Sequence, residues 1–235
     1  MNKLKEIFKG SRKTTQIIME TISVYIVSLV YICTVNLKDT YTEKAGKILL
    51  RLGIRSVTVD DIARELGVSK KTIYVYFKNK KDLVLSILKQ KLKKDREKLK
   101  QSVEESENAI DELLIMSKYI EEEFYSINPS ILHDIKKYHA EAWDILEKHK
   151  WTFVLNGIEK NIYRGIKEDI YHNECTPSII AKLYVGKCDL IMNGEIFEYP
   201  EHKLDLVFRD AIFFHIRGLV NSKGLNYLQK RLKNT

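Results

Sequence analysis

Proline, glycine and cysteine are scarce in this sequence. Its 235 residues include 3 Pro, 10 Gly and 3 Cys, while 44% of residues are hydrophobic and 31% are charged. So few turn-forming residues, beside many Lys, Glu, Leu and Ile, favour a helical protein over one built of strands and tight turns. The chain is long enough to bury a substantial core, either in one large domain or in a small domain and a larger one.

The three cysteines, Cys33, Cys175 and Cys188, are far apart in the sequence and odd in number. Their spacing matches neither a disulfide framework nor a metal site, and it is consistent with a reducing compartment. The six histidines form no cluster with metal-ligand spacing, and the sequence contains no Gly-rich phosphate loop and no nucleophile elbow. We therefore expect a cytoplasmic protein that is not an enzyme and has no catalytic site, metal or cofactor.

Positive charge is concentrated in one part of the chain. The net charge is +8, but residues 38–100 hold 18 Lys or Arg against 8 Asp or Glu, whereas residues 101–235 hold 17 against 22. A basic segment joined to a mildly acidic one suggests a polyanion-binding head on a body with another role. The alternative is that Lys-rich helices are simply well solvated, and charge alone does not choose between the two.

The first 37 residues differ in character from the rest. Residues 1–20 are polar and basic, and Thr21–Leu37 contains no charged residue. Three interpretations stay open: an extra packed helix, a membrane anchor, or non-native sequence from a start codon assigned too far upstream. We favour the first or the last, because 17 residues that include Thr, Ser and Asn are at the lower limit for a membrane-spanning helix.

The sequence from residue 45 onward predicts two helices in succession. Apolar residues recur at helical spacing over residues 45–52, and Gly53 follows as a C-terminal stop. Thr58 is a good N-cap for a second, two-turn helix, with Asp61 at the reciprocal position of a capping box. Gly67 then ends that helix, in a backbone conformation of positive φ that glycine tolerates.

A third helix is predicted after Ser69, which serves as its N-cap. Its first residues, Lys70–Thr72, carry groups that reach phosphates or base edges, whereas Ile73 and Phe77, four residues apart, face the core. Two short helices joined by a Gly-containing turn form the helix-turn-helix pattern, whose second helix enters the major groove of DNA. Asn79 caps a fourth helix whose free amides suit a backbone phosphate. The alternative is a generic three-helix bundle without a DNA role.

The string TVDDIARELGVSKKTIYVYFKNKKDL, which starts at Thr58, resembles the DNA-binding region of the TetR family of bacterial transcriptional regulators. The resemblance covers about residues 40–85, through both helices, the turn and the start of the fourth helix. It implies an N-terminal three-helix domain with the helix-turn-helix and a larger helical domain for effector binding and dimerisation. It also implies a homodimer on double-stranded DNA with a partly palindromic operator, and an unknown small-molecule effector.

The resemblance assigns DNA-contacting roles to individual residues. Four lie where the family contacts bases or nearby backbone: Lys70, Thr72, Tyr74 and Val75. Four lie where it typically contacts phosphates: Thr58, Ser69, Tyr76 and Lys80. Val75 departs from the polar or aromatic residues often seen at its position, so we expect only methyl contacts with thymine from it. Lys71 replaces a frequent Gly or small residue and is expected to add a phosphate contact.

Beyond the DNA-binding head (residues 38–85), the sequence predicts helices only. A long amphipathic helix from Lys80 to about Glu105 links the head to the body, and its basic outer face is interpreted as solvated rather than as a second DNA site. Five further helices follow, over residues 109–127, 130–150, 151–170, 176–197 and 201–220. We predict an all-α chain with an uncertain extension at residues 1–37, a DNA-binding domain at 38–85 and a helical ligand-binding and dimerisation domain at 86–235.

Two sets of residues in the body are candidates for the roles that the resemblance implies. The candidate lining of an effector pocket is Met116, Tyr119, Phe124, His133, Trp143, Phe153 and Tyr163. The candidate dimer interface, on the last two long helices, is Leu183, Tyr184, Lys187, Leu190, Ile191, Phe208, Ile212, His215, Ile216 and Leu219. Aromatic residues at helical spacing are more often plain core than pocket, so that alternative stays open.

The leading interpretation is a sequence-specific DNA-binding transcriptional regulator, a repressor that a small molecule releases from its operator. The alternative is a DNA-bound structural or partner-recruiting protein that takes no inducer, and an apolar cavity in the body would argue against it. A third interpretation, a membrane-tethered regulator, depends on Thr21–Leu37 being an anchor. The sequence does not identify the effector, the operator, the regulated genes or the sign of regulation.

Overall fold

Helices account for nearly all the regular structure of the protein. The computed structural model describes residues 37–125, 127–128, 130–193, 196–198 and 200–233. The described part of the first helix covers residues 37–52. The helices that follow are α2 (Val59–Glu65), α3 (Lys70–Tyr76), α4 (Lys80–Glu105), α5 (Ala109–Tyr125), α6 (Ser130–Tyr138), α7 (Ala140–His149), a π-helical segment (Lys150–Val154), α8 (Leu155–Lys167), α9 (Pro177–Asn193), α10 (Leu204–Leu219) and α11 (Ser222–Lys233). Within these ranges there is no named strand, which confirms the predicted all-α class.

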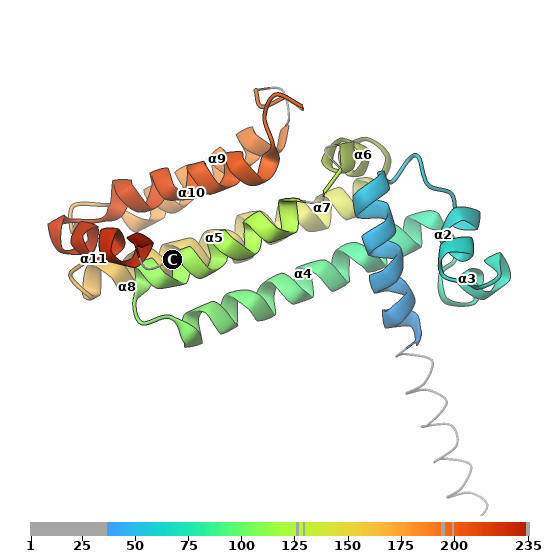
Figure 1. Cartoon of the computed structure of the whole chain (residues 1–235), viewed down its shortest axis with the longest axis horizontal. Coiled ribbons are helices and arrows are strands. Elements are labelled where there is room, and N and C mark those ends of the chain that lie inside the picture. Colours follow the sequence, from blue (N-terminus) through green and yellow to red (C-terminus); the bar gives the residue numbers. More distant parts are fainter. Residues whose placement is uncertain (1–36, 126, 129, 194–195, 199, 234–235) are drawn as a thin grey trace, which may run out of the picture.

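Helix α4 connects the two parts of the molecule (Figure 1). Its N-terminal end lies at the head, beside α2, α3 and the helix over residues 37–52, and the helix then runs into the body along α5. On the other side of α5, α9 and α10 lie next to each other, and α9 also packs on α8. The head therefore sits at one end of the molecule, and a helical body forms the other end.

Two clusters of buried side chains hold these parts together. The first combines head residues such as Ile62, Ile73 and Phe77 with Ile131 of α6 and Ala142 of α7. The second lies in the body, where α5, α8, α9, α10 and α11 meet. The predicted domain boundary after residue 85 falls inside α4, and the head shares its core with α6 and α7. The division into domains at that boundary therefore stays a prediction.

The helix boundaries in the middle of the body differ from those predicted. Apolar spacing predicts one helix over residues 130–150 and another over 151–170, but the chain breaks at His139, where φ is −133° and ψ is 61°. From Ala140 to Lys167 it is then helical without interruption, with the π-helical segment inside that run. The break at His139 allows α6 to pack on the head while α7 runs along α4, and local periodicity does not report such a change of direction.

Helix α11 is absent from the sequence prediction, which ends with the helix over residues 201–220. It docks through Gly224, because a Cβ atom there would lie 2.1 Å from the carbonyl oxygen of Ile170, too close for any larger residue. Leu228, one turn further on, is buried in the second core cluster. The short amphipathic pattern of α11 is stable because a close backbone contact holds it, not because of its own propensity.

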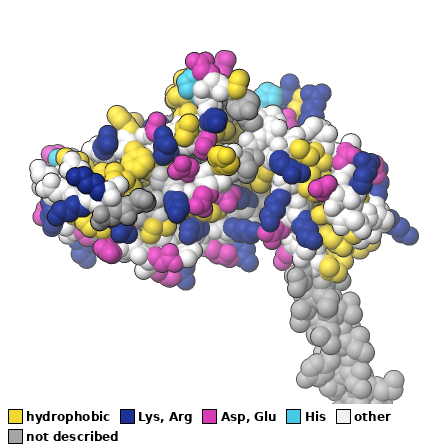
Figure 2. Space-filling view, viewed as in Figure 1, with side chains coloured by type: hydrophobic (Ala, Val, Ile, Leu, Met, Phe, Trp, Pro, Cys, Tyr) yellow, Lys and Arg dark blue, Asp and Glu magenta, His cyan; other side chains and the backbone are white. Residues whose placement is uncertain are grey.

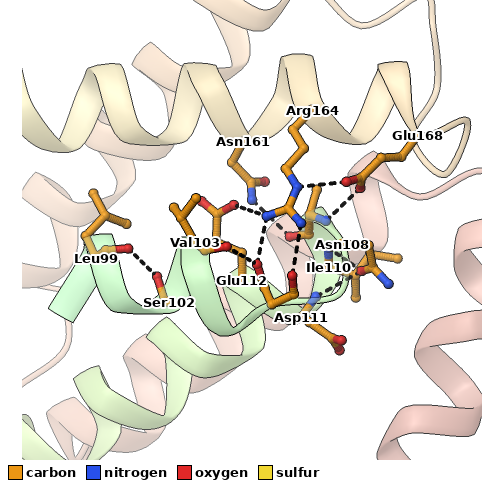
Figure 3. A network of polar contacts seen from close by, with 12 residues as sticks. Leu99, Ser102, Val103, Asn108, Ile110, Asp111, Glu112, Asn161, Arg164 and Glu168 are labelled. Atoms are coloured by element: carbon orange, nitrogen blue, oxygen red, sulfur yellow. Dashed lines mark hydrogen bonds and ion pairs between the residues drawn. The ribbon is translucent and has the colours of Figure 1, made fainter.

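A polar network ties the corner between α4 and α5 to α8 (Figure 3). The guanidinium of Arg164 donates from Nη1 to Ser106 Oγ, 2.7 Å away, and pairs with the buried Glu112 carboxylate at 3.0 Å. Its Nε donates to Glu168 Oε1, 2.7 Å away. Burial raises the pKa of Glu112, and the hydrogen bond and charge of Arg164 counter that rise. The network fixes α5 against α8, two of the helices that enclose the cavity described below.

The structure does not test the interpretations of the uncharged segment near the N-terminus. Thr21–Leu37 lies outside the described residues, except for Leu37 itself. Within the part of the chain that the structure describes, no helix combines the length and the apolar character needed to cross a membrane. The three interpretations of residues 1–37 remain predictions.

Candidate DNA interface and ligand cavity

The predicted caps of the head are present. The Asp61 N–H donates to Thr58 Oγ1 at 3.2 Å, and the Thr58 N–H donates to Asp61 Oδ2 at 2.9 Å, so the capping box is closed. Gly67 has φ of +67° in the turn that follows. Ser69 caps α3 by accepting a hydrogen bond from the Thr72 N–H at 3.0 Å. These caps fix where α3 begins and therefore which of its side chains point outward.

Helix α3 has one face in the core and one in solvent. Ile73 and Phe77 are 2% and 1% exposed, whereas Tyr74 and Val75 are 44% and 72% exposed. Lys71 is exposed as well. Figure 2 shows Lys and Arg side chains on the head beside acidic and hydrophobic ones. An apolar side chain as open as Val75 leaves its methyl groups free for a partner surface, and their contact with thymine stays a prediction.

Lys70 and Thr72 are already engaged within the head. The Lys70 ammonium lies 2.6 Å from Asp60 Oδ2 of α2, and this hydrogen bond raises the pKa of Lys70. The Thr72 hydroxyl lies 2.8 Å from the Ser69 hydroxyl. To contact DNA, Lys70 must give up or share its hydrogen bond with Asp60, and Thr72 must do the same with Ser69. Tyr76 is half-buried and packs edge to face on Tyr41, with ring centroids 5.3 Å apart, so its hydroxyl end is the part left for a phosphate.

Lys80 has a role inside the head that the sequence did not reveal. Its ammonium donates to the carbonyl oxygens of Ile54 and Val57, in the connector before α2 (residues 54–57). Burial lowers the pKa of Lys80, while the charges of Asp134 and Asp61 oppose that effect. In the free protein, these hydrogen bonds link the connector to the start of α4. The contact of Lys80 with a DNA phosphate stays a prediction.

Side chains of α6 hold the head against the body. The Arg55 N–H donates to Asp134 Oδ2 at 3.2 Å, and the Arg55 guanidinium donates to the Tyr138 hydroxyl at 3.2 Å. Just before α6, the backbone N–H of Asn128 adds a further link by donating to the Leu50 carbonyl at 2.7 Å. These contacts join segments that are about 80 residues apart in the chain, so the orientation of the head depends on the position of α6.

A cavity of about 230 Å³ lies inside the body. Its wall is formed by residues of α4, α5, α7, the π-helical segment, α8, α9 and α10. Four of the predicted pocket residues line it: Met116, Tyr119, Phe124 and Phe153. Further apolar residues of the wall come from α8 and α10, where Ile158, Phe208 and Ile212 lie. Most of the wall is apolar, as is typical of small-molecule sites.

The other three predicted pocket residues lie elsewhere. His133 is exposed on the outer side of α6. Trp143 packs against the head cluster, beneath the ammonium groups of Lys136 and Lys150 at 5.6 and 5.9 Å from its ring centroid. Tyr163 is 58% exposed on α8. None of the three lines this cavity, because helical spacing shows that residues share a face but not what that face meets. His133 and Trp143 instead border a second hollow, beside Lys150 and Asp189, and a role in effector binding stays a prediction for all three.

One polar cluster closes the side of the cavity nearest the head. The Lys91 ammonium pairs with Asp95, contacts the Tyr119 hydroxyl at 2.9 Å and lies 3.2 Å from Glu123 Oε2. The Tyr119 hydroxyl donates to Asp95 Oδ1 at 2.6 Å. Burial alone would lower the pKa of Lys91, but the Asp95 carboxylate outweighs it and raises that pKa. Burial raises the pKa of Tyr119 to about 12, so the hydroxyl keeps its proton at neutral pH.

Comparison with known proteins identifies the head. A family model described as "Bacterial regulatory proteins, tetR family" matches residues 43–87, the segment that contains α2, α3 and their caps. The head of this chain is a DNA-binding region of the TetR type. A curated relative, the uncharacterized HTH-type transcriptional regulator YvaF of Bacillus subtilis (strain 168), is 26% identical over 150 residues, which are 62% of this chain and 74% of the relative.

Solved structures of transcriptional regulators share the fold of most of the chain. A proposed transcriptional regulator from Saccharomonospora viridis, in complex with choline, has a TM-score of 0.64 at 18% identity and covers 79% of this chain and 98% of its own. FadR from Bacillus subtilis, in complex with stearoyl-CoA, has a TM-score of 0.55 at 20% identity and covers 76% and 97%. These matches show the fold, and the relatives named here are transcriptional regulators rather than enzymes.

The face predicted for dimerisation points mostly into the core of the chain itself. Seven of the ten candidates are buried within the chain: Tyr184, Ile191, Phe208, Ile212, His215, Ile216 and Leu219. These seven side chains are part of the core because α9 and α10 have apolar residues on two faces, and one of those faces packs within the chain. The predicted interface stays a prediction. Lys187 is half-buried, and its ammonium donates to the Ala211 carbonyl at 2.7 Å.

The same two helices also have an outward apolar face. Leu183 and Leu190 of the original set are exposed, and Ile179 and Phe214 join them. Leu183 is 64% exposed and Phe214 is 77% exposed. In Figure 2, hydrophobic side chains are visible over the part of the surface that α9 and α10 form. Contiguous apolar side chains on a surface typically mark an interaction site.

Proposed function

We propose that this regulator is a repressor that binds a partly palindromic operator as a homodimer and leaves it when a small molecule occupies the body. DNA binding and transcriptional regulation are supported by the TetR-type head and by the relatives described above. Repression, release by a ligand and dimerisation are the proposed parts. In this proposal, residues 38–85 are the DNA-binding unit and residues 86–235 are the ligand-binding and dimerisation unit.

The observation that carries the proposal is that α4 belongs to both units. Leu92, Asp95 and Leu99 of this helix line the cavity, and Lys80, its first residue, is hydrogen-bonded to the connector of the head. A ligand that binds one position of α4 more tightly shifts the population of heads that can reach DNA. The cavity also weighs against the alternative of a DNA-bound structural protein that takes no inducer.

The outward face of α9 and α10 supports the dimer. Leu183, Leu190 and Phe214 are exposed apolar side chains on two helices that the resemblance assigns to dimerisation. Two copies of such a face bury each other in a self-complementary contact with twofold symmetry, and a twofold dimer matches a partly palindromic operator. The two recognition helices then reach successive major grooves.

Binding to the DNA upstream of the gene tests the proposal. We expect the protein to bind that DNA in a gel shift at moderate salt, with a clear preference over random DNA of equal length. Tyr74→Ala is expected to change the sequence preference, whereas Lys71→Ala is expected to weaken binding to all sequences about equally. Equal binding of upstream and random DNA would contradict a sequence-specific regulator.

The ligand is not indicated by the fold alone. Two structural neighbours contain choline and stearoyl-CoA, compounds that differ in size and in charge. Because identity to both is 20% or less, neither compound is carried over to this chain. The lining of the cavity itself is therefore the evidence on which a ligand class can be proposed.

A further inference from the structure

One residue of the cavity wall has a buried polar atom that no hydrogen bond satisfies. His149, the last residue of α7, lines the cavity and is 7% exposed, and its Nδ1 has no partner within the described part of the chain. Its ring stacks on Phe153, with centroids 4.9 Å apart. The π-helical segment begins at the next residue and places Phe153 on the same wall. An unpaired buried polar atom destabilises a protein, and π-helical turns often occur at functional sites.

The His149 ring is neutral at neutral pH. Burial lowers the pKa of this imidazole, and the nearby charge of Arg96 lowers it further. A neutral imidazole protonated on Nε2 has a lone pair on Nδ1, which accepts a hydrogen bond. This unpaired atom, on a residue of the cavity wall, is therefore suited to a ligand that donates an N–H or O–H.

Carboxylates outnumber cations in the ion-pair clusters around the cavity. Lys91 lies between Asp95 and Glu123, Lys150 contacts Glu147 and Asp189, and Arg164 contacts Glu112 and Glu168. Each of these three clusters has one cation and two carboxylates. The clusters thus give the surroundings of the cavity an excess of negative charge, which favours a cation inside it over an anion.

The two lysines on the wall do not offer an anion site. Lys91 and Lys150 line the cavity, but each ammonium is already paired with two carboxylates. Arg96 lies over the Phe153 ring, 5.7 Å from its centroid, and its side chain is exposed to solvent, which screens its charge. An anionic ligand would have to displace one of the carboxylates, whereas a cationic ligand would leave all three clusters intact.

Aromatic side chains in the cavity wall are suited to contact both the charge and the apolar part of such a ligand. Phe124 and Phe208 stack on each other at 4.5 Å, and both line the cavity together with Tyr119 and Phe153. Aromatic rings attract an organic cation through their π faces and also pack against its apolar part. The volume of about 230 Å³ is below the range of about 300–1,000 Å³ that is usual for drug-sized ligands, so the enclosed ligand is small.

We propose that the cavity binds a small organic cation, an amine with an apolar or aromatic body whose protonated nitrogen donates a hydrogen bond to His149 Nδ1. This inference rests on the proposed function, because it names the ligand class for the regulatory cavity. It excludes free carboxylic acids and whole acyl thioesters of nucleotides as the enclosed ligand, since both bring negative charge.

Three probes with the same apolar body and different end groups test this ligand class. Phenylbutylamine, phenylbutanol and phenylbutyrate are titrated into the full-length protein by calorimetry at neutral pH. We expect the amine to bind about tenfold or more tightly than either of the others, the factor that one charge-assisted hydrogen bond contributes. Equal affinity for amine and alcohol, tighter binding of the carboxylate, or no binding of any probe overturns the inference.

Matched variants locate the interaction. His149→Phe keeps a ring on Phe153 but removes Nδ1, and it is expected to abolish the preference for the amine, whereas His133→Phe, the same change at an exposed position of α6, is expected to leave it unchanged. Glu123→Gln removes one of the carboxylates beside Lys91 and should reduce the preference for the amine over the alcohol. Glu122→Gln is its control, because Glu122 is exposed and does not line the cavity. Melting temperatures of all four variants show whether each is folded, and a folded His149→Phe protein that keeps the preference overturns the inference.

DNA binding by the same preparation separates this inference from the proposed function. If the protein prefers upstream DNA but shows no amine preference, the ligand class is wrong and the regulator stands. If it binds the amine but no upstream DNA, the proposed repressor fails while the cation site stands. If the amine also lowers the affinity for upstream DNA, in proportion to its occupancy of the cavity, both are supported.

Discussion

The backbone N–H of Arg55 donates to the carboxylate of Asp134, 3.2 Å away, although 79 residues separate the two in the chain. Asp134 is buried on α6, and Arg55 belongs to the connector that precedes the helix-turn-helix. This hydrogen bond is one of the direct polar links between the head and the body. It makes α6 part of the support of the DNA-binding head.

Replacement of Asp134 by Ala tests that link. The change removes a buried, charged acceptor, so we expect the free energy of unfolding to fall by about 1–3 kcal/mol. Chemical denaturation followed by circular dichroism measures the loss. Asp144→Ala, on the exposed side of α7, is the control and is expected to change stability by less than about 0.5 kcal/mol. Similar losses in the two variants would contradict a supporting role for Asp134.

Lys80 and Lys81 are neighbours with different surroundings, and their alanine variants are expected to differ. Lys80 donates to two carbonyl groups in the head, whereas Lys81 is exposed. Lys80→Ala should lower the melting temperature by about 2–4 °C, as the loss of about 1 kcal/mol does in a chain of this size. Lys81→Ala should leave the melting temperature unchanged. Thermal unfolding of the free proteins, without DNA, makes the comparison, and equal melting temperatures would show that the Lys80 contacts do not stabilise the head.

Phe214→Glu is expected to dissociate the proposed dimer without unfolding the subunit. The Phe214 side chain is 77% exposed in the single chain, so a glutamate there is solvated in the monomer but buried without a partner in the dimer. Analytical ultracentrifugation at micromolar concentration reports the change from dimer to monomer. Tyr163→Glu is the matched control, since Tyr163 is exposed on α8, away from this face. A dimeric Phe214→Glu protein would place the interface elsewhere.

His215 is expected to make stability depend on pH in the mildly acidic range. Burial lowers the pKa of His215 to about 3, and the charge of Lys187 adds to this effect. In the unfolded chain the pKa of histidine is about 6.5, so the unfolded state binds more protons between these two values and stability falls as the pH drops below about 6.5. From pH 7 to pH 5 this single group accounts for a loss of about 2 kcal/mol.

The variant His215→Leu removes this contribution, so its free energy of unfolding should decrease less than that of the native protein between pH 7 and pH 5. Denaturant titrations at several pH values measure the two slopes. His133→Leu is the control, because His133 is exposed and its replacement should leave the slope unchanged. Parallel curves for the native protein and His215→Leu would show that the buried imidazole does not resist protonation.

The head could be predicted closely because its signals are local. A capping box needs only Thr58 and Asp61, three residues apart, and a positive-φ turn needs only Gly67. The alternation of buried Ile73 with exposed Tyr74 and Val75 likewise follows from the pitch of one short helix. Such features survive in any tertiary context, and they are the same features that carry the resemblance to the family.

The body was harder to predict because several of its helices are apolar on more than one side. Phe208 and Ile212 form a regular pattern on α10, and that pattern packs on α5 and lines the cavity within the same chain. Periodicity also placed Tyr163 in the pocket, although it faces solvent. Which of two apolar faces becomes core depends on the neighbouring helices, and no local spacing contains that information.

The sequence by itself determined that the chain is helical, that residues 58–83 form a capped helix-turn-helix, and that this segment resembles the TetR family. Each of these depends on interactions within a few residues of one another. Only the tertiary structure decided that Lys80 fastens the connector, that α6 supports the head, and that His149 reaches a cavity surrounded by excess carboxylates. Those relationships join distant segments, because burial and charge pairing are settled by where helices cross and not by their order along the chain.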